Sequence, residues 1–116
     1  MFTRGIRGAT TVKNNDKAEI IAATTELLRK LVADNSLPVE TIASALFSAT
    51  PGLNAEFPAV AAREIGWQDT PLMCMQEIAV PGALANCIRV LLLVNTEKKP
   101  QEMKHVYLRD AVNLRR

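Results

Sequence analysis

The chain has 116 residues, of which 14 are Lys or Arg and 12 are Asp or Glu, and its formal charge is +2. Hydrophobic residues make up 48% and charged residues 22%, the balance of an ordinary globular protein, and we expect residues 1–116 to form a single domain. So small a net charge, without a cluster of basic and aromatic side chains, argues against a nucleic-acid partner.

The first predicted elements are a strand and a long helix. Phe2 to Arg7 reads as the strand, and extended or loop structure follows through Val12. Asp16 and Glu19 have the three-residue spacing of a capping box, in which each side chain bonds the backbone N–H of the other residue. Apolar residues then recur at helical spacing, which predicts an amphipathic helix over about residues 17–35.

A second helix and a second strand are expected next. Pro38 suits the first turn of a helix, and Ile42 and Leu46 lie four residues apart, as on the inner side of one. Residues 46–50, LFSAT, then read as a short strand that ends at the following Pro-Gly pair.

Asn54 predicts the start of a third helix, because its side chain can accept hydrogen bonds from the free N–H groups of a first turn. That helix is expected to run to about Ile65, where Gly66 suits a C-terminal stop. Residues 72–80, LMCMQEIAV, read as a third strand with little solvent exposure. The Pro-Gly pair that follows is expected to turn the chain into a short Ala/Leu helix.

The last third of the chain contains two further predicted strands. Residues 87–96, CIRVLLLVNT, form the fourth strand, and residues 97–104 are a polar surface connection. Residues 105–108, HVYL, read as a short fifth strand, and residues 109–116 as a basic tail.

Strands that alternate with helices predict an α/β or α+β fold, in which a β-sheet is packed by helices on one face. The third and fourth strands are apolar at both alternating positions, which implies burial on both sides. Three or four helices leave part of that surface bare in so small a chain, so we expect other subunits to cover the rest.

The two cysteines, Cys74 and Cys87, each lie in an apolar stretch and are expected to be free thiols in a reducing cytoplasm. Charged residues interrupt the apolar residues near Met1, so no signal peptide is expected there. The longest apolar run, residues 90–94, is far too short to span a bilayer, and we expect no membrane partner. We also expect neither a metal nor a cofactor, because the sequence has no metal-ligand pattern and no Gly-rich phosphate loop.

Arginine residues beside apolar runs are the strongest chemical signal. Arg7 and Arg89 stand at strand ends, Arg63 on a helix and Arg115 near the C-terminus. Each has a plain alternative: a strand-end side chain that reaches water, a solvated helix charge or a frayed tail. Glu77 is harder to dismiss, because a carboxylate in an apolar strand needs a partner; a structural ion pair with one of these arginines is the alternative.

These residues together suggest a pocket with several guanidinium groups and one carboxylate. Guanidinium groups bind carboxylates in bidentate geometry, so the implied ligand is a small organic anion with more than one carboxylate and a hydroxyl for Glu77. Tyr107 is more often a core ring with a satisfied hydroxyl, and Cys74 is most simply a small core residue.

Four blocks of the sequence carry a family resemblance. They are RGIRGATTV at the start, SATPGLNAEFPAVAARE in the middle, and then CMQEIAVPGALANCIRV and HVYLRDAVNLR. In this order and at these separations they resemble the monofunctional, trimeric AroH-type chorismate mutases, from Arg4 to Arg115. The resemblance implies conversion of chorismate to prephenate on the route to phenylalanine and tyrosine. It also implies a homotrimer with active sites at the subunit interfaces, in which the sheets form a pseudo-α/β-barrel.

The same resemblance assigns roles to individual residues. It implies that Arg89 is the principal catalytic residue, facing the ether oxygen and a carboxylate, and that Glu77 binds the ring hydroxyl. The residues it implies for substrate binding are Arg7 and Tyr107 at carboxylates, Cys74 near the hydroxyl, Phe57 and Arg63 lining the site, Met73, Met75 and Gln76 of the third strand, and Leu114 with Arg115 in a C-terminal cover.

The implied reaction is an intramolecular pericyclic rearrangement, which needs no nucleophile, metal or proton transfer. Its rate would come from holding the reactive conformer and from a fixed positive charge where the ether bond breaks. Two alternatives share the same residues. One is a non-catalytic trimeric binding domain for a small dicarboxylate metabolite, and the other is a structural oligomer in which Glu77 pairs with Arg89.

Cys74 and Glu77 differ by three positions, so on a regular strand their side chains project to opposite faces. Both side chains therefore cannot point at one ligand unless the strand bulges or ends between them. The simplest arrangement is that Glu77 supplies its carboxylate and Cys74 its backbone N–H.

Overall fold

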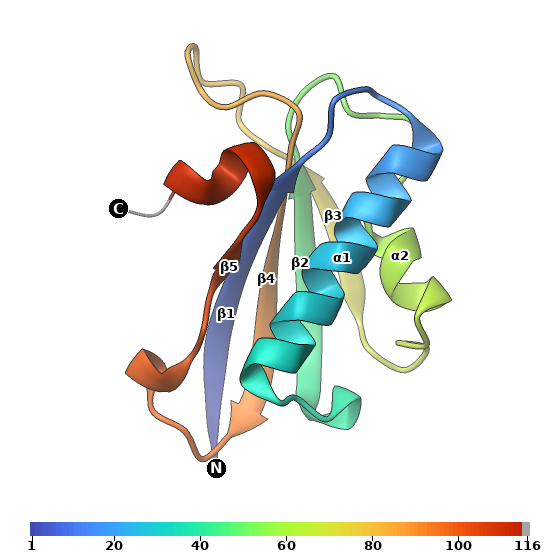
Figure 1. The fold of residues 1–116 in the computed structure, drawn as a ribbon. Coiled ribbons are helices and arrows are strands. Elements are labelled where there is room, and N and C mark those ends of the chain that lie inside the picture. Colours follow the sequence, from blue (N-terminus) through green and yellow to red (C-terminus); the bar gives the residue numbers. More distant parts are fainter. Residues whose placement is uncertain (115–116) are drawn as a thin grey trace.

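A five-stranded sheet forms the centre of the molecule in the computed structural model, which describes residues 1–114 (Figure 1). Its strands lie in the order β3-β2-β4-β1-β5. The elements are β1 (Phe2–Thr11), α1 (Lys17–Asn35), η1 (Val39–Thr41), β2 (Ile42–Ala49), α2 (Ala59–Glu64), β3 (Leu72–Gln76), β4 (Cys87–Thr96), η2 (Pro100–Glu102), β5 (Val106–Tyr107) and η3 (Arg109–Asn113), where η denotes a 3₁₀ helix.

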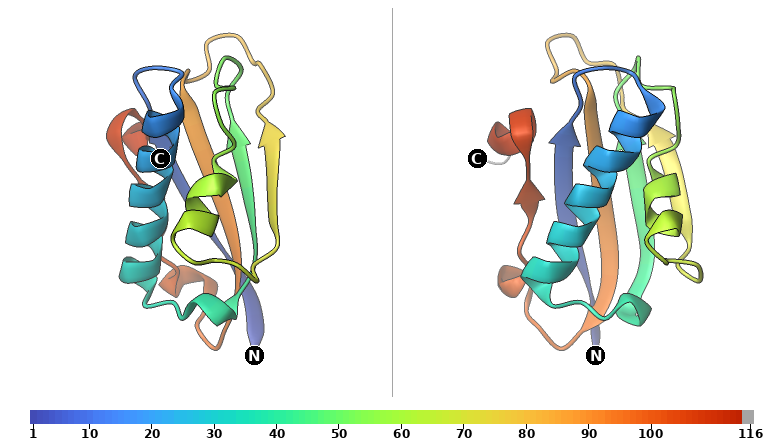
Figure 2. Two further views of the ribbon diagram at one scale, coloured as in Figure 1. Left: turned by 90° about the vertical axis from the view of Figure 1, so that its right-hand side faces the viewer. Right: turned by 45° about the vertical axis from the view of Figure 1, so that its right-hand side comes forward.

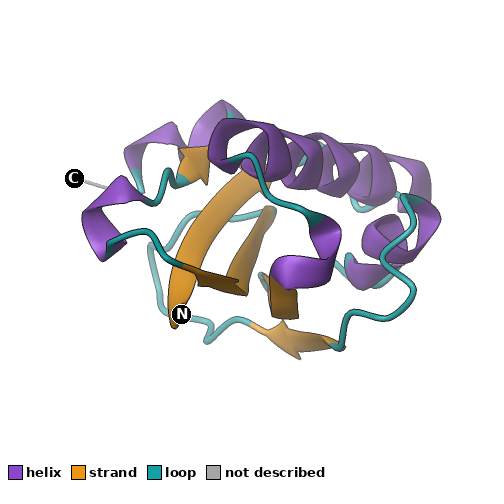
Figure 3. Cartoon of the chain, turned by 90° about the horizontal axis from the view of Figure 1, so that it is seen from below, coloured by secondary structure: helices purple, strands orange, loops and turns teal. Residues whose placement is uncertain are grey.

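The sheet is mixed, and its two α-helices lie on one face. β4 pairs antiparallel with β1 and β2, while the outer pairs β1–β5 and β2–β3 are parallel. Figure 2 shows α1 and α2 in front of the strands, and Figure 3 shows α1 running along one side of the sheet. The predicted α+β architecture, a sheet packed by helices on one face, is therefore confirmed, and the opposite face remains open over β2, β3 and most of β4 in the single chain.

Helix α1 has the bounds that its sequence predicts, but only half of the expected capping box forms, because the Glu19 carboxylate accepts from the N–H of Asn14 and not from that of Asp16. The Asp16 side chain accepts a hydrogen bond from the Glu19 N–H at 3.0 Å, which satisfies one donor of the first turn. Ser36 ends the helix in the left-handed conformation, and its N–H bonds the Ala33 carbonyl. The apolar stripe of α1 contributes Leu27 and Leu31 to the core, and both are fully buried.

Gly8 lets β1 approach α1 closely. A Cβ atom at this position would lie 2.9 Å from Cδ1 of Leu31 and 3.1 Å from Cδ1 of Leu27. The strand continues beyond the predicted end at Arg7 as far as Thr11, because β4 pairs with it along its whole length. This pairing gives Arg7 a fixed place in the middle of a strand.

The predicted second helix is wrong. Only the short η1 follows Pro38, and Ile42 already begins β2. Ile42 and Leu46 lie four residues apart, and a spacing of four fits one face of a strand as well as one face of a helix. A register shift between Ile42 and Ser44 shows where the strand adjusts to β4.

The structure also corrects the third helix. α2 begins at Ala59 rather than at Asn54, whose N–H instead donates to Oδ1 of Asn15 at 3.0 Å. The C-terminal stop is as predicted, since Gly66 has a φ of 100° and the chain leaves the helix there. This hydrogen bond attaches the loop between β2 and α2 to the loop before α1, and the residues after Asn54 form a long connection instead of a helix.

The stretch from residue 72 to residue 80 is more exposed than its composition predicts. β3 ends at Gln76, and it is an edge strand with a partner on one side only. Ile78 and Val80 follow it with 84% and 58% of their surfaces exposed. No helix forms after Gly82 among residues 81–86, which are turns and bends, so the predicted Ala/Leu helix is also wrong.

Candidate functional site

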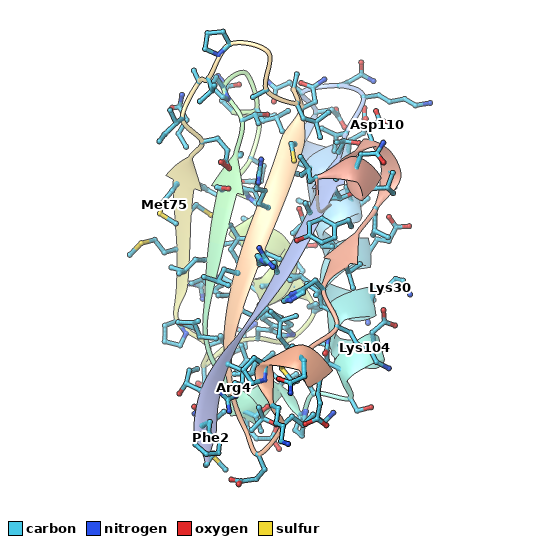
Figure 4. All side chains as sticks on the ribbon, turned by 90° about the vertical axis from the view of Figure 1, so that its left-hand side faces the viewer. Phe2, Arg4, Lys30, Met75, Lys104 and Asp110 are labelled. Carbon is cyan, nitrogen blue, oxygen red and sulfur yellow. The ribbon has the colours of Figure 1, made fainter. Side chains whose placement is uncertain are left out.

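The open face of the sheet places residues from all five strands side by side. We name two rows of cross-strand neighbours after their arginines. The Arg89 row consists of Met75, Ser48, Arg89, Ala9 and Tyr107, from β3, β2, β4, β1 and β5 in turn. The Arg7 row consists of Met73, Leu46, Leu91 and Arg7. Figure 4 looks onto this face, with Met75 projecting from its β3 edge.

Glu77 lies immediately beyond β3 and turns its carboxylate toward the Arg89 row. Its N–H extends the ladder by donating to the Ala49 carbonyl at 2.9 Å. Its Oε2 accepts a hydrogen bond from Oγ of Ser48 at 2.7 Å and lies 3.3 Å from Nε of Arg89. The Glu77 side chain is 25% exposed and that of Arg89 46%, so solvent weakens this ion pair and it contributes little to stability.

A cavity of about 400 Å³ opens beside this cluster, and we call it the open-face pocket. It collects six of the predicted site residues, namely Arg7, Met75, Glu77, Arg89, Tyr107 and Leu114. Two guanidinium groups and one carboxylate give the pocket a net positive charge, while Leu46 and Leu91 supply apolar walls. Such a pocket suits a small anion with an apolar body.

A second cavity, of about 580 Å³, lies between the β2–α2 loop and β3, and we call it the edge pocket. Four predicted residues line it: Phe57, Cys74, Met75 and Gln76. Met75 lines both cavities, so they lie on the two sides of the same edge strand. Phe57 is 67% exposed there, which is unusual for a large aromatic side chain.

Three predicted residues line neither cavity. Arg63 is exposed on α2, where its carbonyl accepts from Nε2 of Gln68. Met73 is exposed on β3, in the Arg7 row. Arg115 lies outside the described residues.

Cys74 and Glu77 project to opposite sides, as their spacing predicts. The Cys74 side chain packs against the core between sheet and helices, whereas Glu77 contacts Ser48 and Arg89 on the open face. Backbone bonds at the two ends of the β2–β3 pairing run from Ala45 N–H to Pro71 and from Glu77 N–H to Ala49. Odd-numbered residues of β3 therefore bond β2, and the N–H of Cys74 points to the free edge of the sheet.

Both thiols are held in the protonated form. Burial raises the pKa of Cys74, and a hydrogen bond from the Ala59 backbone only partly opposes it. Burial likewise raises the pKa of Cys87. The nearby charge of Arg89 opposes this rise in pKa, and the charge of Glu77 adds to it. A thiol is nucleophilic only as the thiolate, so neither side chain is suited to nucleophilic catalysis at neutral pH.

Neither a metal cluster nor a membrane helix is found in the described part of the chain. Within residues 1–114, no three His, Cys, Asp or Glu side chains gather so that they could hold a metal ion. None of the helices in that range is long and apolar enough to cross a bilayer.

Ser48 is the residue of the pocket that sequence reasoning missed. It lies opposite Arg89 on β4 and next to Met75 on β3, and it bonds Glu77 directly. The available signal was its place in LFSAT, where a polar residue follows the fully buried Phe47 and must therefore point to the other face.

Comparison with known proteins gives consistent matches. The family model for chorismate mutase type I matches residues 3–116. Chorismate mutase AroH of Bacillus subtilis (strain 168) is 47% identical over 116 residues, which cover 99% of this chain and 91% of that protein. The Thermus thermophilus protein of the same name is 46% identical over 115 residues, covering 98% and 94%. A solved chorismate mutase from Clostridium thermocellum superposes with a TM-score of 0.91 at 51% identity, covering 92% of this chain and 96% of that one.

Proposed function

The chain belongs to the type I chorismate mutase family, and from this premise we propose that it is a chorismate mutase with Arg89 at its catalytic centre. The enzyme is an isomerase that converts chorismate to prephenate, the step that leads toward phenylalanine and tyrosine. The observation that carries the assignment is the convergence of Arg7, Glu77, Arg89 and Tyr107 on the open-face pocket.

The pocket matches the chemistry of chorismate group by group. Chorismate has two carboxylates, a ring hydroxyl and an ether bond that breaks during the reaction. Arg7 and the Tyr107 hydroxyl bind carboxylate oxygens, and Glu77 accepts a hydrogen bond from the ring hydroxyl. The apolar walls hold the ring and exclude water from it.

Arg89 supplies the charge that the rearrangement requires. Negative charge grows on the ether oxygen as the C–O bond breaks, and a fixed cation there stabilises the transition state more than the substrate. Its contact with Glu77 engages Nε, and the guanidinium group has four further N–H donors to offer the ether oxygen and a carboxylate. The rest of the pocket holds the compact conformer in which the reacting carbons meet.

We propose that each complete active site is built by two copies of the chain in a homotrimer. The open-face pocket and the edge pocket flank β3 within one chain, and the substrate-binding residues are divided between them. β3 has a free edge, and Met73, Ile78 and Val80 are exposed along it and beyond it. A neighbouring copy seated there covers these side chains and brings its Phe57 and Arg63 to the open-face pocket.

The cytoplasm is the compartment that we assign to this enzyme. Cys74 and Cys87 are both free, the state that a reducing compartment maintains.

Chorismate itself provides the test of the activity, because its ultraviolet absorbance falls when it rearranges. The purified protein is expected to make that absorbance fall with saturation kinetics, and prephenate is expected to accumulate. If the protein gained thermal stability from chorismate but left the absorbance unchanged, it would be the binding domain for a dicarboxylate instead. If it showed neither effect, the arginine cluster would be purely structural.

A further inference from the structure

We propose that Ser48 is the positioning residue that fixes the Glu77 carboxylate for the substrate hydroxyl. The proposal rests on the proposed function and adds to it a residue of β2 that does not itself bind chorismate. It is carried by the 2.7 Å hydrogen bond from Oγ of Ser48 to Oε2 of Glu77.

The need for a positioning residue follows from where Glu77 lies. It is the first residue after β3, and the described chain beyond it runs through exposed Ile78 and Val80. The last torsion of a Glu side chain is broad and lacks sharply preferred angles. One long contact, the 3.3 Å approach of Nε of Arg89, would leave the carboxylate free to rotate.

Ser48 supplies the second contact from a rigid element. It sits inside β2, which is paired on both sides, with Met75 on β3 and Arg89 on β4 as its cross-strand neighbours. Its hydroxyl and Nε of Arg89 both address Oε2 of Glu77. The two donors fix the plane of the carboxylate, and Oε1 remains available to accept from the ring hydroxyl.

The size of residue 48 matters as well. Ser48 lines the open-face pocket together with Leu46 and Glu77. A larger side chain there would occupy space that the ligand needs, whereas Ala would keep the space and lose the donor. The hydroxyl and the small volume thus have separable effects.

The test compares Ser48→Ala with Ser44→Ala in the chorismate assay. Ser44 is the matched control because it lies on the same strand, opposite Leu93, and lines neither cavity. The ring hydroxyl does not change during the rearrangement, so its binding affects substrate and transition state alike. We expect Ser48→Ala to raise KM about tenfold and to change kcat by less than about twofold. Ser44→Ala should leave both constants unchanged.

Ser48→Thr keeps the hydroxyl but adds a methyl group beside the pocket, so it should recover only part of the lost affinity. In a Glu77→Ala background, Ser48→Ala should add no further loss, because the partner through which it acts is gone. Thermal unfolding of each variant shows whether the fold is intact, and a folded Ser48→Ala protein with the kinetics of the unmodified enzyme would overturn the proposal. So would a loss confined to kcat, which would mean that Ser48 acts through Arg89, or a loss that adds fully to that of Glu77→Ala. If the unmodified protein itself left chorismate unchanged, the proposed function would fail instead.

Discussion

Arg89 is the residue on which the mechanism depends most. It lies between Ser48 and Ala9 in its row, with Nε held by Glu77 and nearly half of its side chain exposed to the pocket. The uncharged variant Arg89→Gln is expected to lower kcat by about 10²–10³-fold, the effect of removing one preorganised donor from a developing oxyanion. The measurement is the steady-state rate of chorismate loss.

Arg29→Gln is the matched control for that variant, because Arg29 is an exposed charge on the outer side of α1. It should retain full activity, and both variants should elute in gel filtration like the unmodified protein. A folded Arg89→Gln enzyme with a normal kcat would remove Arg89 from the catalytic centre.

Cys74 and Glu77 lie three positions apart in the sequence, but their side chains are expected to contribute unequally to activity. Cys74 directs its side chain into the core and its N–H to the sheet edge, so Cys74→Ala keeps the group that is proposed to reach the substrate. We expect Cys74→Ala to retain most of the kcat/KM and Glu77→Ala to lose most of it. Kinetics of the two folded variants decide this, and an inactive Cys74→Ala protein with native thermal stability would contradict the backbone assignment.

Individual residues of the pocket could be predicted only where a sequence motif contained them or where the alternation of side chains along a strand fixed their direction. The spacing of Cys74 and Glu77 gave their opposite orientations, because alternation along a strand is a local property. The Ser48–Glu77 bond joins residues 29 positions apart, and it depends on the register between β2 and β3. Local patterns do not determine such a register, so Ser48 escaped prediction.

At the scale of elements, the segments with the strongest apolar pattern were predicted best. α1 and β4 have the expected bounds, since a strong helical period or a long apolar run outweighs other tendencies. The helix expected after Pro38 does not form beyond the short η1, and the one expected from Asn54 begins only at Ala59. A proline or a capping residue also suits a turn, so neither residue alone identifies a helix start. The prediction that β3 has little solvent exposure was wrong, because β3 is an edge strand and its place in the sheet depends on the order of the strands.

Close packing of β1 on α1 gives a prediction about stability. Gly8→Ala places a Cβ atom 2.9 Å from Cδ1 of Leu31, so the helix or the leucine side chains must shift. The free energy of unfolding in urea is expected to fall by about 1–3 kcal/mol. Gly5→Ala on the same strand is the control, because its Cβ would meet only Cδ1 of Leu91, at 3.4 Å. Equal stability of the two variants would show that β1 and α1 separate easily.

At the scale of the whole molecule, the reaction proposed for the pocket uses no proton transfer, which predicts its dependence on pH. Burial raises the pKa of both thiols, so they stay protonated through neutral pH and ionise only above their ordinary range. We therefore expect kcat/KM to be level from mildly acid to mildly alkaline pH. A bell-shaped profile would indicate a general acid and base and would exclude the electrostatic mechanism.

The open face explains why a chain of this size has a strand that is apolar on both sides. One face of β4 is covered by the helices, and the other carries Arg89, Leu91 and Leu93 toward the open-face pocket and the surface beside it. The prediction of burial by neighbouring subunits followed from this pattern alone. Which groups meet across such an interface depends on packing between copies, which no pattern within one chain determines.

Whether two copies of the chain complete one active site can be decided by mixing two impaired variants. Arg89→Gln damages the open-face pocket, and Phe57→Ala combined with Arg63→Ala damages the part that a neighbour is proposed to contribute. When the two proteins are unfolded together and refolded as mixed oligomers, about a quarter of the interfaces combine two intact halves. We expect chorismate turnover far above that of either variant alone, approaching this fraction of normal activity. Mixed oligomers that form but remain as inactive as their parents would contradict this expectation.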